Sequence, residues 1–321
     1  MTNARRLFAA VALIAFHLFG PLTGHAETGP KTRAASVLFK RFETVAYART
    51  DFLSNLDIRN FGEDVDSLGD LRFPFIELIG GLHGLGPNAG RDVGKGYSAF
   101  LAGAKDFAGP EGLGMVSSRT CYIGMVEGGA QPDIEPDFRQ ASYESIDGRQ
   151  VWTWSMPPYE GYPRPTKFYA AQIAGSYFVM TNNREDFQEA VNALTSAENS
   201  ESASISAPGW ETFSAHKYWV YRLFRRSGVV NSDAAGIRDL TPDVIALTFF
   251  ADVDKRESFL RVLSSDKSVK TAPKIFRAAE LNHFQPLEPG IWQATIPLSK
   301  DEAGFDALFE VFYRFGFGVA L

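Results

Sequence analysis

Two runs of alternating apolar and polar residues, joined by Asp147-Gly148, constrain the fold of this chain more than any other feature. The runs cover residues 138–146 and 149–156. A two-residue Asp-Gly loop between such runs is a strong signal for a β-hairpin, because both turn positions need a positive φ. In the second run, from residue 152 onward, every other residue is large and apolar: Trp152, Trp154 and Met156. The pattern therefore predicts antiparallel strands with one apolar face.

A second hairpin and a helix are predicted directly after the first hairpin. Gly175-Ser176 separates strand-like runs at 168–174 and 177–181. Asn182, with Glu185 three residues later, forms a capping box, which marks the start of a helix. Apolar residues then recur at helical spacing in a single stripe: Phe187, Ala190, Val191 and Leu194. We expect an amphipathic helix here.

The second half of the chain repeats this order of elements. The pattern predicts a strand at 244–252, a helix capped by Asp254 and Glu257, a hairpin of 275–282 and 291–298, and a last helix capped by Ser299 and Glu302. We therefore expect an α+β fold, with antiparallel sheets and capped amphipathic helices on one face, in two related halves. The expected boundaries are an N-terminal half at 27–195, a linker at 196–209 rich in Ser, Ala and Glu, and a C-terminal half at 210–321.

Glycines are concentrated between residues 80 and 90, after a strand predicted at 73–79 and before a helix predicted at about 92–107. This context suits a phosphate-binding loop. The spacing of Gly84, Gly86 and Gly90 is one residue too long for the dinucleotide-binding fingerprint. We therefore predict a structural or flexible loop.

Residues 1–26 have the three parts of an export signal. Arg5 and Arg6 supply positive charge, residues 7–19 are apolar apart from His17, and Gly24 and Ala26 place small residues at a cleavage position. The apolar run is too short for a lasting membrane anchor, and no other segment is suited to span a membrane. We expect an exported protein, periplasmic or extracellular, by the general secretory or the twin-arginine route. The single cysteine, Cys121, excludes an intrachain disulfide.

The sequence carries no convincing catalytic or metal-binding motif. The net charge of -6 argues against sequence-independent binding of nucleic acid, which needs many cations near phosphates. No histidine of residues 27–321 has a second His or Cys at a zinc-ligand spacing, and we expect neither metal nor cofactor. His83, in the glycine-rich stretch, is the histidine best placed to act as a general base. A solvated loop residue is the favoured interpretation, because no residue nearby in the sequence would orient the ring.

Aromatic residues around a proline-rich loop form the candidate ligand-binding site. Tyr159 and Tyr162 lie in a loop with four prolines, directly after Trp152 and Trp154. Rigid aromatic rings stack on sugars and anchor protein interfaces. The alternative is that both tryptophans fill the core and the tyrosines cover the strand edge.

The stretch Tyr177-Phe-Val-Met-Thr-Asn-Asn-Arg-Glu-Asp-Phe187 and the ending Arg314-Phe-Gly-Phe-Gly-Val-Ala-Leu321 resemble sequences in an uncharacterised family of exported bacterial proteins. The resemblance implies export and an α+β fold, and it brings no activity. We therefore expect a non-catalytic binding or structural protein of the cell envelope or extracellular space, with a glycan or an envelope protein as its partner. The alternative is an extracellular polymer hydrolase that uses paired carboxylates.

Overall fold

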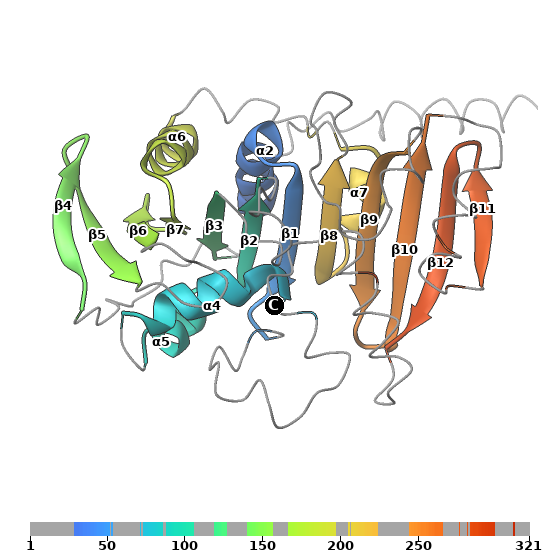
Figure 1. Ribbon diagram of the computed structural model, residues 1–321, viewed down its shortest axis with the longest axis horizontal. Helices are drawn as coiled ribbons and strands as arrows, with labels where there is room; N and C mark the ends of the chain where they lie inside the picture. The colour runs from blue at the N-terminus through green and yellow to red at the C-terminus, as the bar shows by residue number, and fades with distance from the viewer. Residues whose placement is uncertain are drawn as a thin grey trace, which may run out of the picture.

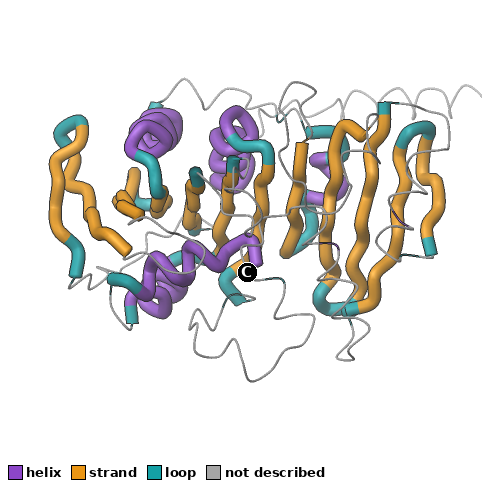
Figure 2. The backbone as a smooth tube through the Cα atoms, viewed as in Figure 1, coloured by secondary structure: helices purple, strands orange, loops and turns teal. Residues whose placement is uncertain are grey.

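A single antiparallel sheet of twelve strands organises the described part of the chain (Figures 1 and 2). The computed structural model describes residues 29–51, 73–85, 88–105, 119–126, 140–156, 166–196, 207–223, 244–265 and 283–298, with residues 53, 71, 205, 276, 281 and 311. The strand order is β11-β12-β10-β9-β8-β1-β2-β3-β7-β6-β5-β4. This arrangement of strands and helices confirms the predicted α+β class.

The strands are β1 (Thr44–Arg49), β2 (Ala99–Ala104), β3 (Thr120–Met125), β4 (Ser142–Ile146), β5 (Arg149–Met156), β6 (Thr166–Ile173), β7 (Tyr177–Thr181), β8 (Tyr218–Leu223), β9 (Val244–Asp252), β10 (Glu257–Ser264), β11 (Phe284–Glu288) and β12 (Ile291–Pro297). The helices are α2 (Pro30–Arg41), η2 (Phe73–Phe75), α4 (Ile76–His83), α5 (Ala89–Gly96), α6 (Arg184–Thr195) and α7 (Trp210–Phe213).

Strands β1 to β7 form one side of the sheet and strands β8 to β12 the other, and the two sets meet at the β1–β8 pair. The chain follows a similar path within each set. Strands β1, β2 and β3 form a meander, after which the chain moves to the outer edge at β4 and returns through β5 and β6 to β7, beside β3. Strands β8, β9 and β10 form a second meander, after which β11 takes the other outer edge and β12 returns beside β10. Because β1 pairs with β8 over five residue pairs, the sheet is continuous between the two sets.

Each face of the sheet buries its own hydrophobic core. Helices α2, α6 and α7 contribute to one core, through Leu38, Phe187 and Phe213. Helices α4 and α5 contribute to the core on the opposite face, through Leu82 and Val93. In Figure 1, α2 and α6 accordingly lie above the middle of the sheet, and α4 and α5 lie below it. Helices thus cover both faces of the sheet, whereas the sequence pattern predicted helices on one face only.

The predicted hairpins around Asp147-Gly148 and Gly175 are confirmed. Asp147 and Gly148 have φ values of 52° and 76°, as a two-residue hairpin turn requires. The second loop covers residues 174–176, and Ala174 and Gly175 have the positive φ values, one residue earlier than predicted. The predicted apolar stripe of α6 is also confirmed, because Phe187, Ala190, Val191 and Leu194 are all buried.

The strand predicted at 73–79 was wrong, because this segment forms η2 and α4. Its glycines serve close packing of a helix on the sheet. A Cβ atom at Gly81 would lie 2.3 Å from Cε of Met180 and 3.5 Å from the ring of Phe168. The helix expected at 92–107 is also shorter, because α5 ends at Gly96 and β2 begins at Ala99.

The helix predicted after Asp254 was wrong. Residues 253–256 form a turn in which Arg256 has a φ of 54°, and the chain continues as β10. Phe259 and Leu263 lie on one face of this strand and Val262 on the other, so three apolar residues fitted a helical stripe by coincidence. In the last hairpin the first strand is β11, at Phe284–Glu288 rather than 275–282. The helix predicted after Ser299 and most of the linker lie outside the described residues.

Candidate functional site

The N-terminus of α6 is capped by Asn183, one residue later than predicted. Its side-chain oxygen accepts hydrogen bonds from the backbone N–H groups of Glu185 and Asp186, at 3.0 and 3.1 Å. Asn182, the predicted cap, instead accepts from the backbone N–H of Thr120 at 2.9 Å and so binds the start of β3. The first turn of α6 is thereby fixed against the sheet.

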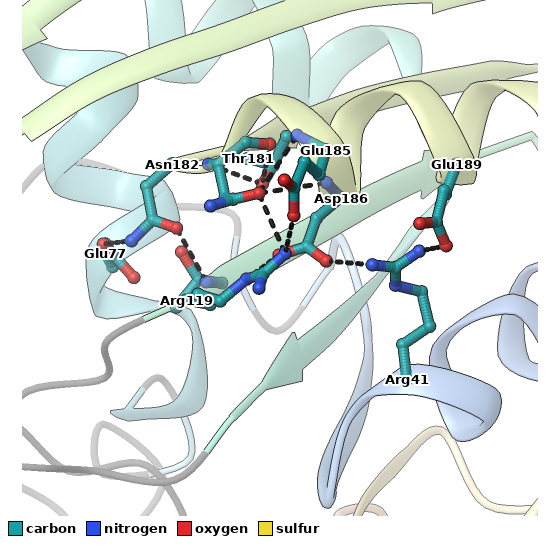
Figure 3. Close-up of polar contacts among 10 residues, drawn as sticks. Arg41, Glu77, Arg119, Thr181, Asn182, Glu185, Asp186 and Glu189 are labelled. Atoms are coloured by element: carbon teal, nitrogen blue, oxygen red, sulfur yellow. Dashed lines mark hydrogen bonds and ion pairs between the residues drawn. The ribbon is translucent and has the colours of Figure 1, made fainter.

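Asp186, in this first turn, is a fully buried carboxylate that lies between two arginines (Figure 3). Nη2 of Arg41, at the end of α2, lies 2.7 Å from Oδ1 of Asp186. Nε of Arg119, just before β3, donates to Oδ2 at 2.6 Å. Arg119 also donates to the cap residue Asn183 at 3.0 Å, and Arg41 pairs with Glu189 one turn further along α6.

These contacts shape the electrostatics of the cluster. The hydrogen bond to Asp186 is the largest influence on Arg119 and raises its pKa, so this guanidinium stays charged. Both carboxylate oxygens of Asp186 are occupied by arginines, and the side chain has 0% exposure. Through these ion pairs the cluster joins α2, α6 and the start of β3.

The same cluster continues to the other face of the sheet through Glu77 of α4. The amide of Asn182 donates to Oε1 of Glu77 at 3.2 Å, and the hydroxyl of Tyr122 donates to Oε2 at 3.3 Å. Figure 3 shows Asn182 between Glu77 and the first turn of α6. Polar contacts at the ends of β3 and β7 thus connect helices that cover opposite faces.

The predicted aromatic site includes one residue that the structure places in the core. Trp154 is 6% exposed, stacks on Phe168 at 5.4 Å, and donates from Nε1 to the carbonyl oxygen of Gly81 at 3.0 Å. Its ring is therefore not accessible to a ligand in this structure. Trp152, two residues earlier on β5, is only partly buried. Of the two tryptophans, Trp152 is the one with accessible surface.

Sequence reasoning did not select Tyr143, which lies directly opposite Trp152 in the β4–β5 pair. Tyr143 is 61% exposed, and it is one of two strongly exposed large hydrophobic residues in the described part of the chain. A signal for it was present in the sequence. The two-residue turn at Asp147-Gly148 fixes the register of the hairpin, and counting outward from this turn pairs Tyr143 with Trp152.

The two outer edges of the sheet differ. Strand β11 carries Pro286 and a register shift between Pro286 and Glu288, and both features hinder the addition of another strand. Strand β4 pairs with β5 over five consecutive residues without a shift, and its sequence contains no proline. The charge of Glu144 is balanced by Lys167 at 3.0 Å and Arg184 at 3.3 Å. The β4 edge therefore lacks the protection that β11 has.

The remaining predicted site residues are not brought together by the described structure. His83 is the last residue of α4, in a helix rather than in a glycine loop. Tyr159 and Tyr162, between β5 and β6, lie outside the described residues. Within the described ranges, no group of three or more His, Cys, Asp or Glu side chains is placed to hold a metal ion. No helix among these residues is long and apolar enough to cross a membrane.

Comparison with known proteins gives no family. No protein-family model and no curated protein matches the chain. Among solved structures, crystal form I of TP0453 aligns with a TM-score of 0.43 and 9% identity, over 87% of this chain and 97% of that one. Crystal form III of TP0453 aligns with a TM-score of 0.45 and 9% identity, over 86% and 97%. These TM-scores and identities are too low to indicate a function.

Proposed function

We propose that this chain is an exported, non-catalytic binding protein of the cell envelope or the extracellular space, and that it contacts its partner at the β4–β5 edge of the sheet. The observation that carries the proposal is the cross-strand pair of the exposed Tyr143 and the partly buried Trp152 on the outermost hairpin. Export rests on the signal-like residues 1–26.

The chemistry of this edge suits recognition rather than catalysis. Tyrosine and tryptophan offer large contact area with few rotatable bonds, so immobilising them on binding loses little side-chain entropy. No described strand pairs with the outer side of β4, so an extended polypeptide can add there by β-augmentation. Tyr159 and Tyr162 follow β5 in the sequence and are candidates to extend the aromatic surface.

Two kinds of partner fit this edge. A glycan would stack on the aromatic rings, and an envelope protein would add a strand to β4 or pack on Tyr143. The alternative function, a hydrolase with paired carboxylates, gains no support from the buried carboxylate Asp186, because arginines occupy both of its oxygens.

Binding of purified envelope material by matched variants tests the proposal. The protein from residue 27 onward would be sedimented with insoluble cell-wall glycan and with envelope membranes that retain their proteins. Tyr143→Ala removes the exposed ring at the β4 edge, and Leu287→Ala removes the 42% exposed side chain on β11 as a control. We expect Tyr143→Ala to weaken binding to one fraction at least tenfold and Leu287→Ala to leave it unchanged. Equal binding by both variants, or no binding to either fraction by the unmodified protein, would refute the proposal.

A further inference from the structure

Arg261 lies on β10, on the face of the sheet that α2, α6 and α7 also cover. Its described neighbours on this face are neutral. Its cross-strand neighbours are Thr248 on β9 and Gln293 on β12. The other residues adjacent to it on this face are also uncharged: Phe259 and Leu263 on β10, Ala246 and Phe250 on β9, and Ile291 and Thr295 on β12. Among the described residues of β9, β10 and β12, no carboxylate occupies a position next to this guanidinium on this face.

The contacts that the structure shows for Arg261 involve neutral groups only. Nε and Nη2 both donate to Oε1 of Gln293, at 3.3 and 2.9 Å. The guanidinium carbon lies 5.1 Å from the ring centre of Phe250. Burial lowers the pKa of Arg261, and the charge of Glu288 opposes this effect without forming an ion pair in the described residues. Within the described residues the cation is thus partly desolvated without an acid in ion-pair contact, and an added anion would stabilise it.

The arginines of the Asp186 cluster show the usual arrangement for comparison. Arg41 and Arg119 are also largely shielded from water, with side-chain exposures of 18% and 26%, and each contacts the buried carboxylate of Asp186. Arg261 has no such partner in the described part of the chain. The difference indicates that a negative group from outside the chain can complete its surroundings.

Partly exposed apolar side chains border Arg261. Phe259 stacks on Phe250 at 5.2 Å, and both Phe259 and Leu263 are only partly buried. In the N-terminal half, α2 and α6, each of 12 residues, cover this face of the sheet. The described helix on the same face in the C-terminal half is α7, which has four residues. In the described part of the chain, the partly buried side chains of Phe259 and Leu263 therefore lie beside a cation without an ion-pair partner.

We propose that Arg261 and Gln293 bind the carboxylate of a small organic acid whose apolar part lies along Phe259 and Leu263. The planar guanidinium can place two parallel N–H donors against a carboxylate, and the Gln293 amide can add a third. One guanidinium among neutral residues matches a single negative charge, whereas a phosphate dianion would bring more charge than the site balances. The site is near the sheet end opposite to β4 and does not depend on the function proposed above.

Calorimetric titration with octanoate, below its micelle concentration, tests this site on the protein from residue 27 onward. Acetate, octanol and octyl phosphate serve as comparison ligands. Arg261→Met removes the charge and keeps an apolar stem. Arg91→Met makes the same change at an exposed position of α5 and serves as the control. Gln293→Leu provides a second change in the site if Arg261→Met does not fold.

We expect octanoate to bind, with acetate and octanol each at least tenfold weaker. Arg261→Met should weaken octanoate binding at least tenfold, Gln293→Leu should weaken it to a smaller extent, and Arg91→Met should leave it unchanged. Absence of octanoate binding, or equal binding by the unmodified protein and Arg261→Met, would overturn the proposal. Tighter binding of octyl phosphate than of octanoate would overturn the assignment to a carboxylate.

Discussion

Arg119 and Asp186 form a 2.6 Å hydrogen-bonded ion pair that joins the start of β3 to the first turn of α6, and its carboxylate is fully buried. Arg41 occupies the other oxygen of the same carboxylate. Removal of one member of a buried ion cluster leaves the remaining charges desolvated and unpaired, which makes such clusters sensitive to mutation.

Asp186→Asn should therefore lower the free energy of unfolding by about 3 kcal/mol, because two arginines lose their shared counter-charge. The shift of the urea midpoint measures this loss. Glu185→Gln is the control, because the Glu185 side chain is 77% exposed and its contact with Arg119 is 3.4 Å long. We expect no measurable shift for this variant. A midpoint shift of the same size for both variants would contradict the claim that burial of the Asp186 ion pairs determines the loss of stability.

Gly103→Ala tests the close packing of α2 on β2. A Cβ atom at this position would lie 2.7 and 2.8 Å from ring atoms of Phe42, which is itself 2% exposed. Because the ring has little room to move, we expect a loss of about 1–3 kcal/mol in thermal or urea unfolding. Gly29→Ala is the matched control, since no atom lies within 4 Å of a Cβ there. Unchanged stability of Gly103→Ala would show that α2 is not held this closely to the sheet.

Cys121 should make stability depend on pH in the alkaline range. Burial raises the pKa of this thiol, which is 0% exposed, above its ordinary value. In the unfolded chain the thiol loses its proton above a pH of about 8.5, while the folded protein retains it. The unfolded state then binds fewer protons, so the free energy of unfolding falls as the pH rises past this value.

Urea unfolding at pH 7.0 and at pH 9.5 measures this effect. Cys121→Ala should show a smaller decrease between the two pH values than the unmodified protein. The buried phenol of Tyr97, with a pKa raised to about 12, contributes in the same direction only at higher pH. Identical decreases in both proteins would contradict the assignment of this pH dependence to the thiol.

The parts of the fold that the sequence predicts correctly depend on local chemistry. The turn at Asp147-Gly148 needs positive φ at both positions, and the stripe from Phe187 to Leu194 has a period that only a helix satisfies. Segment 73–79 and segment 257–264 were assigned to the wrong element because short apolar runs fit either period. Tertiary packing decided the element in each case. Gly81 lets a helix approach Met180, and β10 pairs with β9 over its whole length and with β12 from Glu257 to Leu263.

The candidate sites also divide into those that local sequence predicts and those that only the complete sheet assembles. Tyr143 was predictable, because the turn fixes its position opposite Trp152. The cluster of Arg41, Arg119 and Asp186 was not, since its three members come from segments far apart in the sequence and only the complete sheet brings them together. The neutral surroundings of Arg261 likewise depend on the register of three strands.

Site-specific photo-crosslinking in the exporting cell tests the proposed binding edge most directly. A photoreactive phenylalanine analogue would replace Tyr143 on β4 or, as the control, Leu287 on β11, two exposed positions at opposite edges of the sheet. We expect a discrete crosslinked product at position 143 and none at position 287. Mass spectrometry of this product would distinguish a glycan from a protein partner. No product at position 143, or the same product at both positions, would contradict the claim that the β4–β5 edge is the binding surface.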